Sequence, residues 1–211
     1  MIEAKIHLSP NEMEMVTNAE WILTKNGIMQ KARWLLEALQ NQMAGYLKEQ
    51  EGTKGLEIYG TPKISRGENY QGLPYLMLDY PRVFNKSHVM AIRTMFWWGQ
   101  FFSTTLHLAG HYKELSEQKI FSRIDVLKHH NFYLCSNDDE WQHHFETSNY
   151  VPVIDLSQDE FIKIAEGKSF IKIAKKLALH QWNDASDVLF NNFSLLAGLM
   201  MFNFPGDEKV L

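Results

Sequence analysis

The chain has 211 residues, of which 45% are apolar and 22% are charged, and its formal net charge is −4. This length predicts a single domain over residues 1–211, and the apolar share excludes a disordered chain. Because domains that bind nucleic acid usually carry a basic excess, we expect no nucleic-acid partner. The single cysteine, Cys135, cannot form an internal disulfide and favours a reducing, cytoplasmic location.

Neither a secretory signal nor a membrane span is expected. Residues 1–15 contain three glutamates and no apolar run, which excludes the pattern of a signal peptide. The most apolar stretches, 95–102 and 195–204, are shorter than the ~20 residues that a membrane-spanning helix needs. We therefore expect no membrane partner.

Two helices are predicted at the N-terminus. Ser9 can cap the first helix, Pro10 fits its first position, and Glu12 can reach back to the cap. Apolar residues at helical spacing follow, and Gly27 suits the left-handed residue that ends a helix. A second helix is expected from about 28 to 50, so the two would form a helical hairpin.

From Gly55 the apolar spacing changes from helical to alternating, which predicts an irregular first strand that ends near Ile64. A second strand is expected over 73–80, ended or bent by Pro81. The polar, glycine-containing stretch 65–75 between them is expected to be a long connection. Such a loop could present Arg66 and other polar groups to a ligand, or it could be an edge loop with no ligand.

Two aromatic and β-branched strands are predicted over 89–98 and 101–109. A three-residue loop at 99–101 would set Trp98 opposite Phe102 and His107 opposite Arg93. One face would then be apolar and the other would carry the polar groups, whereas a two-residue loop would mix the two sets. The apolar face of these two strands comprises Ile92, Phe96, Trp98, Phe102, Leu106 and Leu108, with Thr94 and Thr104.

The remaining elements are shorter. The stretch 169–179 fits both a helix and a strand, and the break at Gly167 favours a strand for its first half. We expect helices over 113–128, 138–145, 157–167 and 184–201, extended segments over 131–135 and 150–153, and a tail after Phe204. The resulting fold class is α+β, with an antiparallel sheet of about five strands packed on the N-terminal helical hairpin and the C-terminal helix.

The sequence holds no strong catalytic, metal or cofactor motif. His107 and His111 are four residues apart, but on a strand this spacing separates them by ~13 Å. Phosphate loops, dinucleotide fingerprints and nucleophile elbows are absent, and Cys135 is expected to pack as a small apolar residue. The acidic run 138–140 and the lysines at 172, 175 and 176 are interpreted as solvated. We therefore expect no cofactor, no metal and no catalytic residue.

The polar face of the sheet is the predicted functional site. Aromatic walls with a few polar groups describe a small-molecule pocket, and an arginine beside a histidine suits an anionic or carbonyl-bearing ligand. The hypothesis fails if these side chains divide between both faces, or if segment 111–150 fills the polar face. The predicted ligand-binding residues are Arg66, Tyr70, Tyr75, Asp79, Arg93, Trp97, Ser103, Thr105 and His107.

Three classes of function remain open. The first is binding of a small molecule without catalysis, and the second is an enzyme that uses His107 as a general acid or base or as a metal ligand. The third is a homo-oligomeric interaction protein, because ten Met and thirteen Phe leave enough apolar surface for a homodimer. Segments 73–75 and 93–99 favour a bacterial origin, which carries no function with it.

Overall fold

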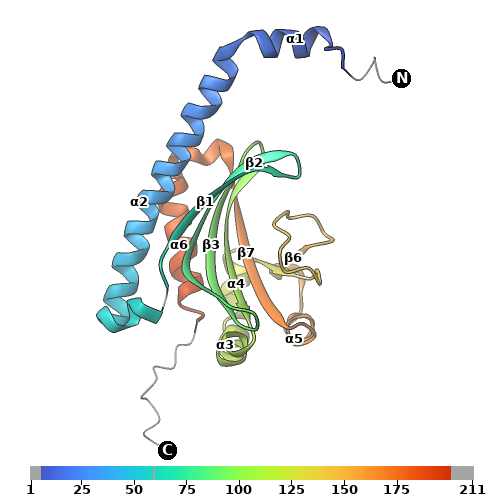
Figure 1. Ribbon diagram of the computed structural model, residues 1–211. Helices are drawn as coiled ribbons and strands as arrows, with labels where there is room; N and C mark the ends of the chain where they lie inside the picture. The colour runs from blue at the N-terminus through green and yellow to red at the C-terminus, as the bar shows by residue number, and fades with distance from the viewer. Residues whose placement is uncertain (1–5, 59, 201–211) are drawn as a thin grey trace, which may run out of the picture.

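The computed structural model describes residues 6–58 and 60–200, which form helices around one antiparallel sheet (Figure 1). The helices are α1 (Pro10–Thr17), α2 (Ala19–Ile58), α3 (His111–Phe121), α4 (Ile124–His129), α5 (Gln158–Glu166) and α6 (Ala185–Ala197), with short 3-10 turns at Val153–Asp155 and Leu179–Asp184. The strands are β1 (Lys63–Tyr70), β2 (Leu73–Phe84), β3 (Val89–Trp97), β4 (Phe101–Ala109), β5 (Tyr133–Cys135), β6 (Tyr150–Pro152) and β7 (Phe170–Ala178).

The sheet has seven strands in the order β1-β2-β3-β4-β7-β5-β6, and neighbouring strands are antiparallel. The α+β class and the antiparallel sheet are confirmed, but the expected number of about five strands is too low. The short strands β5 and β6 make the difference. They extend the sheet beyond β7, where β5 pairs with β7 at only two positions.

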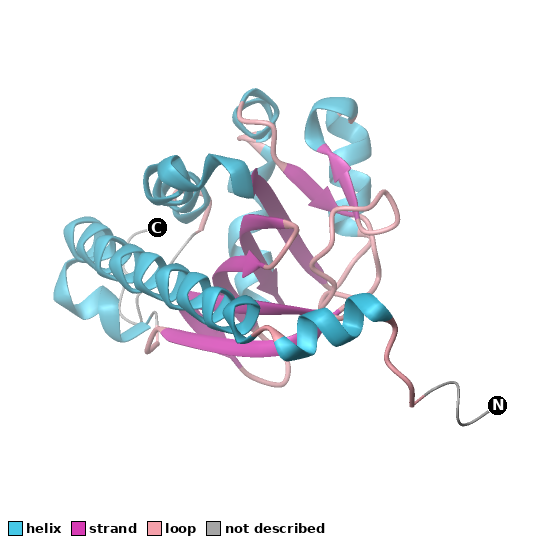
Figure 2. Ribbon diagram, turned by 90° about the horizontal axis from the view of Figure 1, so that it is seen from above, coloured by secondary structure: helices cyan, strands magenta, loops and turns pink. Residues whose placement is uncertain are grey.

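One face of the sheet is covered by α2 and α6, as Figures 1 and 2 show from two directions. The buried stripe of α2, which includes Met29, Leu36 and Met43, packs in the same core as Ile92 and Phe102 of the sheet. These residues are at most 3% exposed, so the core lies between the helices and the apolar side of the strands. Helices α2 and α6 therefore cover the apolar face of the sheet, as the sequence predicts.

The predicted N-terminal hairpin is wrong. The chain breaks at Asn18 rather than Gly27, and the Asn18 Oδ1 atom accepts a hydrogen bond from the backbone N–H of Glu20 at 3.0 Å. Gly27 lies inside α2, which continues as one helix to Ile58. A single glycine costs a helix about 1 kcal/mol, which the buried stripe of α2 can offset. Residues 55–58, where the first strand was expected to begin, are therefore helical.

The β3–β4 loop occupies 98–100 rather than 99–101. Trp97 pairs with Phe101, so Arg93 lies opposite Thr105 and His107 lies opposite Ala91. The pairing of His107 with Arg93 is therefore wrong. Gly99 takes the left-handed conformation, with φ of 72°, in the middle of the loop. The predicted loop at 99–101 and the observed loop at 98–100 leave the same residues on each face. The predicted separation into an apolar and a polar face therefore still holds.

The stretch 65–70 belongs to edge strand β1 and not to a long loop. A tight turn at Gln71 and Gly72, both with positive φ, joins β1 to β2. Pro81 bends β2 rather than ending it, because the pairing with β3 shifts between Asp79 and Arg82 and then continues to Phe84.

Further along the chain, the predicted helix over 113–128 is divided into α3 and α4. Segment 138–145 forms no helix, and 170–178 is strand throughout. The helix near 157 is confirmed, and Ser157 and Glu160 form a reciprocal cap at its start. The closing helix α6 ends at Ala197, and the expected tail lies outside the described residues.

Candidate functional site

Eight of the nine predicted ligand-binding residues lie on the face of the sheet opposite α2 and α6. Residues paired across antiparallel strands point to the same side, and Asp79, Arg93 and Thr105 form one such row. Arg66 is the exception, because it pairs with Leu76 of the apolar face and contacts Glu68 at 2.6 Å. The residues on the polar face are Tyr70, Tyr75, Asp79, Arg93, Trp97, Ser103, Thr105 and His107.

The centre of this polar face is covered by residues 136–149, which we call the covering segment. Lys172 of β7 binds this segment from beneath, because its ammonium group donates hydrogen bonds to the backbone carbonyls of Glu140 (2.9 Å) and Gln142. The segment has almost no regular structure. Segment 111–150 thus fills the middle of the polar face, which is the outcome that overturns an open pocket there. Two cavities remain beside the covering segment.

Tyr70 holds the covering segment at one end. Its hydroxyl oxygen accepts hydrogen bonds from the backbone N–H groups of His143 (2.8 Å) and His144 (3.2 Å). The Tyr70 ring centroid lies 4.9 Å from that of Trp97 and 5.5 Å from that of His143. Tyr75, which pairs with Trp97 across β2 and β3, extends the same aromatic group.

Arg93 forms a two-pronged ion pair with Asp79 beneath the covering segment. The guanidinium Nε and Nη2 atoms donate to the two carboxylate oxygens of Asp79 at 2.7 and 3.2 Å. A third nitrogen lies 3.4 Å from the Nε2 atom of His143. Both charged side chains are largely buried. This pairing occupies the guanidinium that was expected to bind an anion.

His107 contacts Glu140, a residue that the sequence analysis had placed on a solvated surface. The Nε2 atom of His107 lies 2.7 Å from Oε2 of Glu140. Burial, with the charges of Lys172 and Arg93, lowers the pKa of His107 to about 3. Burial also raises the pKa of Glu140. The buried imidazole is therefore neutral at neutral pH, and its Nε2 atom shares one hydrogen bond with the Glu140 carboxyl group.

The interpretation of Lys172 as a solvated residue is wrong. Lys172 is 1% exposed and its Nζ atom lies 5.4 Å from the ring centroid of Tyr150. Burial lowers its pKa to about 8. Ser103 and Thr105 lie on the same face and are also buried. The polar groups at the centre of the face thus attach the covering segment to the sheet.

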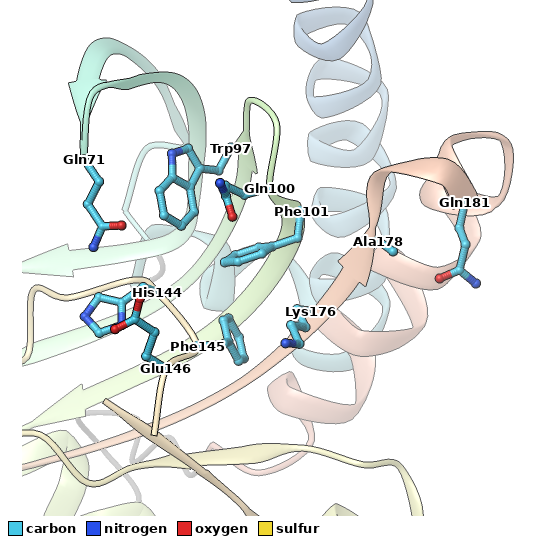
Figure 3. Close-up of a pocket in the computed structure, with 10 residues that line it drawn as sticks. All are labelled: Gln71, Trp97, Gln100, Phe101, His144, Phe145, Glu146, Lys176, Ala178 and Gln181. Carbon is cyan, nitrogen blue, oxygen red and sulfur yellow. The ribbon is translucent and has the colours of Figure 1, made fainter. Parts of the chain in front are cut away.

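Two cavities flank the covering segment. The larger, which we call the Trp97 cavity, opens beside residues 144–146 and has a volume of 690 Å³. Figure 3 shows Trp97, Phe101 and Phe145 along its wall, with Lys176 beside Phe145. The ring centroids of Trp97 and Phe101 lie 5.3 Å apart, and those of Phe101 and Phe145 lie 5.1 Å apart. The polar lining comprises Gln71, Gln100, His144, Glu146, Lys176 and Gln181.

Two buried polar atoms in the lining of this cavity have no partner. Trp97 is 3% exposed and its indole N–H forms no hydrogen bond, and the Nδ1 atom of His144 is likewise unpaired. Buried donors and acceptors in proteins are almost always paired with protein or water. Both atoms have almost no accessible surface, so the ring of Trp97 lines the cavity while its N–H lies beneath the wall.

The second cavity, the Glu140 cavity, lies at the other end of the covering segment and measures 480 Å³. Phe84, Ser87, Trp141 and Ser169 line it together with Glu140. His107 lies behind Glu140 and does not line the cavity. A carboxylate that is hydrogen-bonded to a buried imidazole therefore faces an open space.

Sequence reasoning missed most residues of the covering segment. Glu140, His144 and Phe145 have no periodic pattern, and only the fold brings them to the sheet. Lys172 could have been found, because it alternates with the core residues Ile171 and Ile173 and must face the opposite side.

Cys135 packs beside Tyr150 and Phe170, and burial raises the pKa of its thiol. Within residues 6–58 and 60–200, no group of three or more His, Cys, Asp or Glu side chains is arranged to hold a metal. The same residues contain no helix long and apolar enough to cross a bilayer. No protein-family model, curated protein or solved structure matches this chain.

Proposed function

We propose that the protein binds a small polar molecule with a ring in the Trp97 cavity and does not alter it chemically. The observation that carries this proposal is the aromatic wall of the cavity, in which Trp97, Phe101 and Phe145 lie side by side among polar side chains.

The rings favour a ligand with a flat or apolar face. Trp97, Phe101 and Phe145 offer faces and edges to a ring, and aromatic pairs of this kind contribute about 0.5–1.5 kcal/mol beyond the burial of their area. The volume of 690 Å³ falls within the range of ~300–1,000 Å³ that is usual for small-molecule sites.

The polar lining favours a ligand without net charge. Lys176 and Glu146 contribute one charge of each sign, and three glutamine amides can each donate and accept. Arg93 is held by Asp79. The anionic ligand expected from Arg93 therefore has less support than a neutral ring that carries both donors and acceptors, such as a nucleobase or a sugar.

The experiment is a thermal-shift screen with nucleosides and methyl glycosides, followed by calorimetry on the best probe. Phe101→Ala removes one ring from the wall, so we expect about two- to tenfold weaker binding, the value of one aromatic contact. Trp34→Ala is the matched control, because Trp34 is exposed on α2. Equal affinity in Phe101→Ala, or no stabilisation by any ring compound, contradicts the proposal.

A second candidate function is catalysis at the Glu140 cavity, supported by the 2.7 Å contact between His107 and Glu140. The buried His107 would be a positioning residue, and Glu140, whose pKa is raised, would be the base that touches substrate. Turnover of chromogenic esters or glycosides that is lost in Glu140→Gln but kept in Glu146→Gln would support it. Turnover that persists in Glu140→Gln would exclude it.

A further inference from the structure

The N-terminal arm, which we define as residues 6–34, carries most of the large apolar side chains that the structure exposes. Nine of the eleven such residues in the described part of the chain lie there. They are 49–71% exposed, and none of the residues of α1 is buried. The nine are Ile6, Leu8, Met13, Met15, Val16, Trp21, Ile22, Leu23 and Trp34.

The arm extends beyond the body of the molecule. Figure 1 shows α1 and the first turns of α2 projecting past the end of the sheet, and the first buried residue of α2 is Met29. A short helix exposed to water on all sides is only marginally stable, and helices in proteins are held by burial of an apolar face. The part of the arm before Met29 therefore lacks, within this chain, the packing that would stabilise it.

The charges of the arm are ordered along its length. Its N-terminal part, through Glu20, carries only acidic side chains, and the part from Lys25 to Arg33 carries only basic ones. The acidic residues are Glu12, Glu14 and Glu20, and the basic residues are Lys25, Lys31 and Arg33. Two such arms side by side attract each other when antiparallel and repel each other when parallel. This order is the self-complementarity that a two-fold interface between identical chains requires.

The arm also offers exposed apolar side chains to a partner. The nine side chains are 49–71% exposed, and those on one side of the arm supply the apolar surface for an interface, which buries about 800 Å² per partner in a standard stable complex. Lys25 already contacts Glu68 at 3.0 Å and Arg33 contacts Glu37 at 2.9 Å. These exposed pairs contribute little and can exchange partners on association.

We infer that two copies of this chain associate through their N-terminal arms, antiparallel, about a two-fold axis near Ile22 and Leu23. These residues lie midway between the acidic and the basic groups and are exposed, so apolar side chains meet their copies near the axis. The acidic part of each arm lies beside the basic part of the other. The partner is a second copy rather than a different protein, because the arm is complementary to itself.

The first test is the oligomeric state of the full chain by sedimentation velocity. We expect a dimer, and we expect Ile22→Glu/Leu23→Glu to be a monomer with an unchanged melting temperature of the sheet core, because neither side chain is buried. Ile154→Glu is the matched control, since Ile154 is 56% exposed outside the arm, and it should stay dimeric. A monomeric native chain, or a dimer that survives the double substitution, overturns the inference.

The second test addresses the charge order. Glu14→Lys/Glu20→Lys makes the arm mostly basic and Lys25→Glu/Lys31→Glu makes it mostly acidic, so each variant alone should dissociate. An equimolar mixture of the two should recover the dimer. Two variants that remain dimeric alone, or a mixture that stays monomeric while far-UV circular dichroism shows intact helices, would contradict the antiparallel pairing.

Discussion

The Nε2 atom of His107 lies 2.7 Å from the carboxylate of Glu140, although 33 residues separate them in the sequence. This contact joins strand β4 to the covering segment. The Lys172 ammonium group and the Tyr70 hydroxyl also form hydrogen bonds with backbone groups of the covering segment. The covering segment is therefore attached to the sheet largely through buried polar groups, which makes its attachment sensitive to pH and to single polar substitutions.

Acid should destabilise the protein in the window set by His107. The pKa of its imidazole is about 3 in the folded chain and 6.5 in the unfolded chain. Between these values the unfolded chain binds the proton and the folded chain does not. The free energy of unfolding should therefore fall by up to about 1.4 kcal/mol per pH unit as the pH drops below 6.5. His143, whose burial lowers its pKa, acts with the same sign.

Urea unfolding at about pH 7 and about pH 5 measures this loss. His107→Gln should show a smaller difference between the two conditions than the native chain. Glu140 acts with the opposite sign, because its raised pKa lets the folded chain take up a proton first. A native chain with equal stability at both pH values would contradict the neutral, buried state of His107.

The Asp79–Arg93 pair should be costly to break on one side only. Both side chains are largely buried, so Arg93→Met leaves the Asp79 carboxylate without its partner and should cost about 3–5 kcal/mol. Asp79→Leu/Arg93→Met should cost clearly less than the sum of the two single substitutions. Denaturant unfolding of the four proteins gives the coupling energy. Additive single effects would mean that the pair does not interact.

Tyr70→Phe should loosen the covering segment without unfolding the sheet. The substitution removes the acceptor of two backbone N–H groups, those of His143 and His144, and leaving buried donors unpaired costs about 1–3 kcal/mol. Hydrogen exchange at these two amides should become faster. Tyr75→Phe is the control, because no hydrogen bond from Tyr75 to the segment is present. Equal protection in both variants would exclude the role of the Tyr70 hydroxyl.

Gly27→Ala distinguishes a helix that continues through Gly27 from a helix that ends there. Gly27 lies inside α2, and a Cβ atom added there would meet nothing within 4 Å, so alanine should increase the helix content and add up to about 1 kcal/mol of helix stability. At a left-handed helix end, alanine would have the opposite effect. Gly110→Ala is the contrasting substitution, because Gly110 has φ of 57° and a Cβ atom there would lie 2.2 Å from the carbonyl oxygen of Ser87. Circular dichroism and thermal unfolding distinguish these outcomes.

The two faces of the sheet could be predicted because alternation along a strand allows only two arrangements. Ile92 and Phe96 had to lie on one side, and Arg93 and Trp97 on the other. The register could not be predicted, because loops at 98–100 and 99–101 give the same faces. The predicted break at Gly27 is wrong because the break lies at Asn18, whose side chain caps the helix that follows.

The candidate site could be predicted only where it follows the strands. Trp97 and Tyr70 lie on strands and were identified, whereas His144 and Phe145 reach the cavity on a segment without periodic pattern. The contacts of that segment join residues distant in the sequence, as in the bond from Lys172 to the carbonyl of Glu140. No local spacing encodes such contacts, so the closure of the polar face became evident only from the fold.

The most direct measurement is the response of the tryptophan indole N–H signals in a two-dimensional ¹H–¹⁵N spectrum during titration with the best ring compound. The chain has six tryptophans, and the Trp97 signal is identified by its loss in Trp97→Phe. We expect the Trp97 signal to move and saturate as the compound contacts its ring, while the signals of Trp21 and Trp34 stay in place. A Trp97 signal that does not move while the compound binds would contradict the proposed site.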